Sequence, residues 1–197
     1  MLFRSVPVVV YDDWNRAGSA RAWWVLTAAG VPDVRILDGG WSAWKSAGGP
    51  VETGQVDPAP GDVTVTHQDL YAGALPTLTA DELDRRPLLD ARAPERFRGD
   101  VEPVDPVAGH IPGARNLPST VLLDSDDTFV GDTMVDELLA EREIGAHEAV
   151  GVYCGSGITA AVAVAALTAA GRDAALFPGS WSQWSSDETR PVARGER

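Results

Sequence analysis

The feature that most constrains the fold of this chain is an internal repeat of about 45 residues. Val8-Val9-Val10-Tyr11 opens the first copy and Val150-Gly151-Val152-Tyr153 opens the second. In each copy a turn, an alanine-rich stretch, a glycine and a short apolar run follow in the same order. The copies close on Gly39-Gly40-Trp41-Ser42-Ala43-Trp44 and on Gly179-Ser180-Trp181-Ser182-Gln183-Trp184. A shared order of this kind indicates that one supersecondary unit is built twice.

Each copy predicts a βαβ unit. The valine-rich runs are typical of buried parallel strands. The alanine-rich stretches predict crossover helices that end at Gly30 and Gly171. The apolar runs at 34–37 and 174–177 predict the next strand of each unit. We therefore expect an α/β fold with a largely parallel sheet flanked by helices, and tryptophans at 41, 44, 181 and 184 that pack in the core.

The two copies differ in what precedes them. Before the second copy, Thr79-Ala80-Asp81-Glu82 predicts a capping box that opens a short helix, Leu88-Leu89-Asp90 a strand, and residues 134–142 a helix. Only Met1 to Pro7 stand before the first strand of the first copy. We expect a partial N-terminal domain at 1–54, a linker rich in Pro, Gly, Asp and Thr at 55–76, and a complete domain at 77–197.

Composition excludes several classes of function. A net charge of −13 repels phosphate backbones and anionic lipids, so we expect no nucleic-acid or membrane partner. A single cysteine excludes a disulfide framework and a multi-cysteine metal site, and no cofactor is implied. We see no signal peptide and no apolar run that reaches the roughly 18–20 residues of a bilayer span, so we expect a cytoplasmic protein.

The single cysteine lies where chemistry is expected. Cys154 follows a predicted buried strand and precedes a glycine-containing turn and a predicted helix. A thiol there faces the positive end of the helix dipole and several backbone N–H groups, which favours the reactive thiolate. The competing interpretation is a small buried apolar side chain. The matching position in the first copy is Asp12, so only the second copy carries a nucleophile.

Cys154 to Ala160, read as CGSGITA, resembles the active-site loop of the rhodanese superfamily. Asp90-Ala91-Arg92, Arg96, His110-Ile111-Pro112-Gly113-Ala114 and the Gly-Ser-Trp-x-x-Trp ending are similar to the catalytic domain of tandem rhodaneses. Tyr11-Asp12-Asp13 with Leu37-Asp38-Gly39-Gly40 resembles the inactive N-terminal domain, in which the family has Asp in place of cysteine. The resemblance covers essentially the whole chain and implies that the N-terminal domain lacks its front half.

The resemblance implies a thiosulfate or 3-mercaptopyruvate sulfurtransferase. Cys154 would be the nucleophile that takes sulfur from a small anionic donor as a persulfide and passes it to cyanide or a thiol. Arg96 matches the arginine that binds the donor anion, a role that suits a guanidinium. The loop residues implied in substrate binding are Gly155, Ser156, Gly157, Ile158 and Thr159. We expect Arg92 to pair with an internal carboxylate and His110 to be structural.

The donor stays open at this point. A loop without a basic residue resembles the 3-mercaptopyruvate enzymes, but those enzymes usually have a second arginine, and residues 102–106 contain none. In tandem rhodaneses the N-terminal domain also contributes polar side chains to the active-site cleft, and their positions fall before Met1. A half sheet exposes strand edges and apolar surface, so we expect low solubility, self-association through the incomplete N-terminal domain, or weak activity.

Two alternative functions compete with the sulfurtransferase interpretation. A Cys-x5-Arg phosphatase needs an arginine to hold phosphoryl oxygens, and Ala160 stands at that position, so this function is disfavoured. The second alternative is a catalytically weak or inactive rhodanese-like binding or regulatory module. Persulfide formation on Cys154 would separate such a module from an enzyme.

Overall fold

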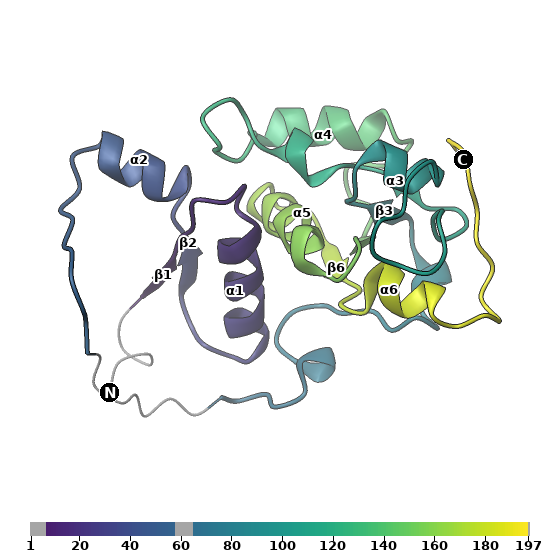
Figure 1. Cartoon of the computed structure of the whole chain (residues 1–197), viewed down its shortest axis with the longest axis horizontal. Helices are drawn as coiled ribbons and strands as arrows, with labels where there is room; N and C mark the ends of the chain where they lie inside the picture. Colours follow the sequence, from purple (N-terminus) through teal and green to yellow (C-terminus); the bar gives the residue numbers. More distant parts are fainter. Residues whose placement is uncertain (1–6, 58–64, 197) are drawn as a thin grey trace.

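The computed structural model describes residues 7–57 and 65–196. Its strands form two separate parallel sheets (Figure 1). The smaller sheet pairs β1 (Val8–Val10) with β2 (Val34–Ile36). The larger sheet has the order β4-β3-β5-β6, with β3 Leu88–Asp90, β4 Arg115–Asn116, β5 Val150–Tyr153 and β6 Ala174–Leu176. All of these pairings are parallel, so the predicted α/β fold is confirmed.

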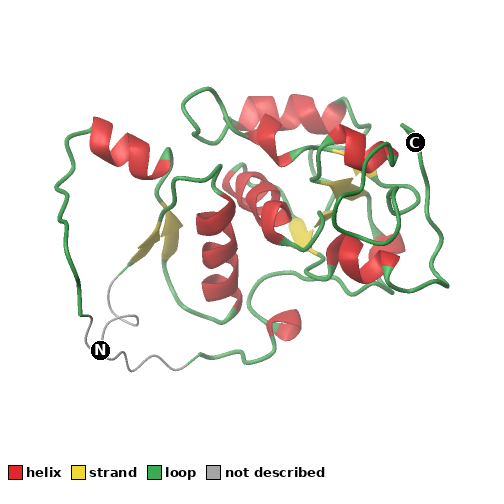
Figure 2. Ribbon diagram, viewed as in Figure 1, coloured by secondary structure: helices red, strands yellow, loops and turns green. Residues whose placement is uncertain are grey.

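Helices lie around both sheets (Figure 2). The six α-helices of the described residues are α1 (Ala17–Ala28), α2 (Gly40–Ser46), α3 (Pro94–Arg98), α4 (Asp132–Ala140), α5 (Ile158–Ala169) and α6 (Ser180–Ser185). Single 3₁₀ turns occur at Leu70–Ala72, Leu83–Arg85 and Ser119–Leu122. The order β1-α1-β2-α2 therefore matches β5-α5-β6-α6, which confirms the repeat.

The two copies also share a hydrogen bond at the turn that follows their first strand. The backbone N–H of Trp181 donates to the carbonyl of Cys154 at 3.0 Å, and that of Trp41 donates to the carbonyl of Asp12 at 3.0 Å. Asp12 is thus the structural counterpart of Cys154. Its carboxylate accepts the N–H of Ser19 at 2.5 Å and forms an ion pair with the buried Arg16 at 3.6 Å.

Helix α5 lies at the centre of the molecule. Every residue from 160 to 167 is buried, and all of them are Ala, Val or Leu. Helix α1 packs along α5, and its buried side chains Ala17, Ala20, Trp24 and Ala28 belong to the same apolar core (Figure 1). Small side chains on both helices allow their backbones to approach closely, because an alanine side chain extends only a short way from the helix surface. This contact joins the N-terminal repeat unit to the rest of the chain.

The opposite face of the N-terminal unit is exposed. Tyr11 is 57% exposed and stacks on Trp41, with ring centroids 5.7 Å apart, and Trp44 is 37% exposed. These aromatic side chains line an apolar groove of about 510 Å³ together with Val9, Leu37, Pro50, Val51 and Glu52. In the second copy Trp181 and Trp184 are buried. The prediction of core tryptophans is therefore confirmed for the second copy and wrong for the first, in which Trp41 is half-buried at the groove and Trp44 is exposed.

Only half of the capping box forms, because Thr79 Oγ1 donates to the Glu82 carboxylate and the Glu82 N–H donates to the Thr79 carbonyl. The helix behind it is a single 3₁₀ turn. Glu82 accepts the backbone N–H of Thr79 at 3.0 Å, as a capping box requires. The turn Leu83–Arg85 then ends at Arg86, whose backbone is extended with φ −157°. Arg86 precedes Pro87, and a residue before proline is driven out of the helical region. Strand β3 begins one residue later, which leaves no room for another turn.

His110 is a buried structural residue. Its ring lies 3.8 Å from the ring of Phe97, and its Nδ1 lies 2.8 Å from the carbonyl oxygen of Phe97. Its backbone pairs with Ala193 and fastens the C-terminal segment to the domain. Nε2 is buried and has no hydrogen-bond partner among the described residues. Burial therefore holds the pKa of His110 below its ordinary value, although the hydrogen bond to Phe97 acts in the opposite direction.

This lowered pKa predicts acid sensitivity. As the pH falls below about 6.5, His110 of the unfolded chain takes up a proton before the folded protein does. Its contribution to the free energy of unfolding is therefore full above that pH and is lost as the pH falls through the lowered pKa. Urea unfolding at a series of pH values should show this loss, and His110→Gln should reduce it. The control His67→Gln should leave it unchanged, and an unaltered pH dependence in His110→Gln would contradict the assignment.

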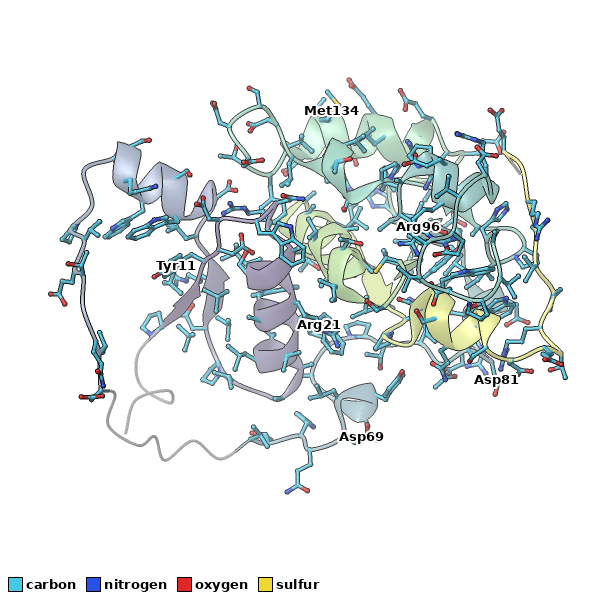
Figure 3. All side chains as sticks on the ribbon, viewed as in Figure 1. Tyr11, Arg21, Asp69, Asp81, Arg96 and Met134 are labelled. Carbon is cyan, nitrogen blue, oxygen red and sulfur yellow. The ribbon has the colours of Figure 1, made fainter. Side chains whose placement is uncertain are left out.

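Self-association through the N-terminal unit stays a prediction. Sedimentation velocity should show a sedimentation coefficient that rises with protein concentration, because apolar surface of this size is seldom left in water. Trp44→Glu should weaken the effect by placing a charge in the groove. Met134→Glu is the matched control, since Met134 is 46% exposed on α4, away from Tyr11 (Figure 3). A monomer at every concentration would refute the prediction.

Candidate active site

A cavity of about 390 Å³ opens where the carboxyl ends of β3 and β5 meet. Ligands of open parallel sheets bind at this edge. The cavity is lined by Ala91, Arg92, Ala93, Pro94, Arg96, Pro118, Ser119, Thr120, Cys154, Gly155, Ser156, Ile158 and Thr159. Trp14 and Asn15, from the turn between β1 and α1, complete its wall. The N-terminal unit therefore does contribute side chains to this cavity.

Cys154 lies at the bottom of the cavity, directly after β5, and is only 2% exposed. Its Sγ accepts a hydrogen bond from the backbone N–H of Gly157 at 3.1 Å. Its own backbone N–H donates to Ser180 Oγ at 3.1 Å. The sulfur thus meets a backbone donor at the start of α5, where partial positive charge accumulates and favours an anionic sulfur.

Gly157 is the residue that shapes this loop. It is the N-cap of α5 and has a φ of +77°, in the left-handed region. A Cβ on this residue would lie 2.6 Å from the carbonyl oxygen of Pro178, closer than real Cβ contacts come. Both constraints restrict the position to glycine. The N–H that reaches Cys154 therefore depends on a backbone conformation that other residues cannot adopt without strain.

Four of the other predicted loop residues lie at the cavity surface. Gly155, Ser156, Ile158 and Thr159 line it, and Ser156 and Ile158 are exposed. Gly155 faces Arg96, since a Cβ added to Gly155 would lie 3.5 Å from Arg96 Nη1. The structure therefore brings the loop and the predicted anion-binding arginine together.

Arg96 is held by two carboxylates. Its Nη2 donates to Glu102 at 2.5 Å and to Asp105 at 3.4 Å, and its side chain is 23% exposed. Burial alone would raise the pKa of Glu102, but hydrogen bonds from Arg96 and from the backbone of Asp105 hold it below its ordinary value. Arg96 Nε is buried without a hydrogen-bond partner among the described residues. One edge of the guanidinium is thus fixed, and Nη1 faces the loop.

Arg92 has a structural role, as expected from the sequence. Its Nη2 donates to Asp90 and to the carbonyl of Gly109, both at 2.7 Å, and its Nη1 donates to Glu102 at 3.2 Å. All three charged side chains are buried. Burial lowers the pKa of Arg92, but the bonds to Asp90 outweigh this effect and raise it above the ordinary value. Glu102 therefore links Arg92 to Arg96.

Sequence reasoning missed several residues of the site. Ser180 is buried with a φ of +53°, an uncommon conformation for a residue other than glycine, and its hydroxyl bonds Cys154 N–H and Phe177 C=O. Its counterpart in the first copy is Gly40, with a φ of +56°. The repeat therefore held a signal, because a serine stands where the other copy has the residue that suits this backbone. Glu102, Trp14 and Asn15 offered no comparable local signal.

Two further features of the described residues bear on function. No helix among residues 7–57 and 65–196 is both long enough and apolar enough to cross a bilayer. In the same part of the chain no three His, Cys, Asp or Glu side chains gather in a way that could hold a metal ion.

Comparisons with known proteins identify the family of this chain. The family model described as rhodanese-like domain matches residues 3–47 and 75–187, so its first stretch falls on the first repeat copy. A Mycobacterium tuberculosis protein (strain CDC 1551 / Oshkosh) named "Putative thiosulfate sulfurtransferase SseB" is 67% identical over 192 residues, covering 96% of this chain and 68% of that protein. A Pseudomonas aeruginosa PAO1 protein named "Probable 3-mercaptopyruvate sulfurtransferase" is 44% identical over 197 residues, covering 96% and 68%.

A solved structure has the same fold. The crystal structure of YnjE matches with a TM-score of 0.82 at 28% identity, and the match covers 97% of this chain and 49% of that one. The first repeat copy, the cavity at the carboxyl ends of β3 and β5 and the cysteine loop lie within the matched regions. The chain therefore belongs to the rhodanese-like family, and its enzyme class is sulfurtransferase.

Proposed function

We propose that this chain transfers sulfur from thiosulfate or 3-mercaptopyruvate to cyanide or a thiol through a persulfide on Cys154. The observation that carries the proposal is the placement of Cys154 Sγ at the bottom of the cavity, 3.1 Å from the N–H of Gly157. A backbone donor at a helix start stabilises a thiolate before the reaction and a persulfide anion after it. Rhodanese-like family membership agrees with this chemistry.

The proposed reaction has two steps. In the first, the Cys154 thiolate attacks the transferable sulfur of the donor, the new S–S bond forms, and the bond between that sulfur and the donor breaks. Sulfite leaves from thiosulfate, or the enolate of pyruvate leaves from 3-mercaptopyruvate and takes up a proton. In the second step a cyanide or thiolate acceptor attacks the outer sulfur, and Cys154 departs as the thiolate. Splitting the transfer in this way is covalent catalysis by an activated nucleophile.

Arg96 is proposed to bind the anionic end of the donor. Its Nη1 faces Gly155, whereas Nη2 is occupied by Glu102 and Asp105. Gly155, Ser156, Gly157, Ile158 and Thr159 are proposed to surround the transferred sulfur, with hydroxyls from residues 156 and 159 and backbone N–H groups from the loop. The N–H groups of Nη1 can donate to a carboxylate or sulfonate oxygen while Nη2 stays bound to its carboxylates.

The charge of the site bears on the choice of donor. Arg92 and Arg96 bring two positive charges, while Asp90, Glu102 and Asp105 bring three negative ones. A doubly charged thiosulfate would meet more repulsion in this surrounding than the single carboxylate of 3-mercaptopyruvate. The relatives carry names of both kinds, so the assay includes both donors.

The remaining features of the proposal follow from the sequence. A nucleophile that works as a free thiol suits a reducing compartment, so we propose a cytoplasmic location for this single-cysteine chain. The division into a partial domain at 1–54, a linker at 55–76 and a catalytic domain at 77–197 also stays a proposal. Limited proteolysis that cuts first within 55–76 would support these boundaries.

The first prediction from the proposed mechanism concerns Cys154. Steady-state sulfur transfer to cyanide should be measurable with at least one of the two donors and should vanish in Cys154→Ser. Mass spectrometry of protein treated with donor alone should show one added sulfur on the wild type and none on the variant. The Ser replacement conserves shape, so matching circular dichroism spectra serve as the control. Folded wild-type protein that gains no sulfur from either donor would contradict the mechanism and favour a binding module.

The second prediction concerns Arg96. Arg96→Gln should raise the KM for the donor by about tenfold or more, because a charged hydrogen bond to the anion is lost. Arg96→Lys should recover part of the loss, since it keeps the charge but not the planar fork. Arg98→Gln is the matched control from the same helix, because Arg98 is partly exposed and pairs with Asp100. An unchanged donor KM in Arg96→Gln would remove Arg96 from the proposed site.

A further inference from the structure

A second helix reaches the cysteine loop from the N-terminal unit. Arg21 lies on α1, the helix that packs against α5, and Figure 3 shows it between the two helices. Its Nη1 donates a long hydrogen bond of 3.5 Å to the carbonyl oxygen of Gly157. Gly157 is the same residue whose N–H reaches Cys154 Sγ at 3.1 Å. A single backbone residue therefore separates Arg21 from the reacting sulfur.

The Arg21 side chain is held in place by its own helix. Its guanidinium carbon lies 5.0 Å from the centre of the Trp24 ring, and Trp24 is fully buried in the core shared by α1 and α5. An arginine over an aromatic face is attracted by the ring and loses little freedom when it stays there. The direction in which Arg21 points is thus fixed by the packing of the two helices.

Arg21 differs from Arg92 and Arg96 in having no ion-pair partner among residues 7–57 and 65–196. Arg92, after β3, pairs with Asp90 and Glu102, and Arg96, on α3, pairs with Glu102 and Asp105. In the described part of the chain no carboxylate forms an ion pair with Arg21, although the protein has 29 acidic residues. Burial lowers the pKa of Arg21, whereas interactions with Cys154 and Tyr71 act in the opposite direction.

We propose that Arg21 is a positioning residue for sulfur transfer: it holds the carbonyl of Gly157, the residue whose N–H reaches Cys154 Sγ, and brings a positive charge to the start of the cysteine-loop helix. The inference rests on the proposed function of Cys154 and deepens it, because it assigns part of the reactivity of the thiol to the N-terminal unit. The same charge favours the thiolate before the transfer and the persulfide anion after it.

The test measures thiol reactivity without any sulfur donor. The rate of Cys154 alkylation by iodoacetamide is followed across a pH series in the whole chain. Arg21→Met keeps a long apolar stem over Trp24 but removes the charge and the hydrogen bond, so it should slow alkylation near pH 7 by about three- to tenfold and move the pH profile upward. Arg21→Lys keeps the charge and should stay closer to the wild type.

The matched control is Arg35→Met, because Arg35 lies in the same unit on β2, is exposed and pairs with Asp33. It should alkylate like the wild type. Urea unfolding of all three variants separates an effect on the thiol from a loss of folding. A wild-type alkylation rate and pH profile in folded Arg21→Met would overturn the inference.

Sulfur-transfer kinetics then relate Arg21 to the proposed function. For a positioning residue, kcat should fall in Arg21→Met while the donor KM changes little, since Arg96 still binds the anion. A donor KM that rises as strongly as in Arg96→Gln would assign Arg21 to donor binding and overturn the positioning role. If the wild type transfers no sulfur, the proposed function fails, and the alkylation profile still decides whether Arg21 acts on the thiol.

Discussion

The packing of α1 against α5 is the contact on which the rest of the structure depends. Its close approach is allowed by alanines on both helices, and it buries part of the α5 surface in the core that the two helices share. The same contact brings the turn between β1 and α1, with Trp14 and Asn15, to the wall of the cysteine cavity. Core packing and the composition of the site are therefore set by one helix pair, and a change in that pair would alter both.

Arg96 provides the local positive charge that an anion-binding site needs in this acidic chain, but its carboxylate partners weaken that charge. Glu102 binds Arg92 and Arg96 together and fixes both, but it also cancels much of their field. A buried network of this kind fixes the orientation of its arginines but keeps most of their donors from a ligand. Breaking any one pair would leave a buried charge without compensation. The network therefore offers a ligand a fixed donor at Arg96 Nη1. The net positive charge that an anionic ligand needs has to come from other residues of the site.

Much of the fold could be predicted from the sequence because the relevant signals are local. The repeat predicted both βαβ units, and the valine runs predicted their first strands. The position of Cys154 between a strand and a helix predicted that it lies in a functional site. What was missed depends on contacts between distant segments: Ser180 meets Cys154 across 26 positions, and Trp14 reaches the cavity from the other repeat copy. The short 3₁₀ turn after Thr79 was missed because Pro87 overrides a correct helix-start signal.

The carboxylate of Asp12 makes the first loop chemically different from the second, which carries Cys154 at the same position. In the proposed reaction the anion beside the backbone donors of the second copy is the sulfur of Cys154, which gains and loses an atom in every cycle. In the first copy it is a side chain, bound by the N–H of Ser19 and paired with Arg16, and it never leaves. The first loop is thus permanently occupied by its own ligand. Trp14 and Asn15 follow Asp12 in this turn and line the cavity, so in the proposed reaction this part of the wall keeps its shape while Cys154 changes its chemical state.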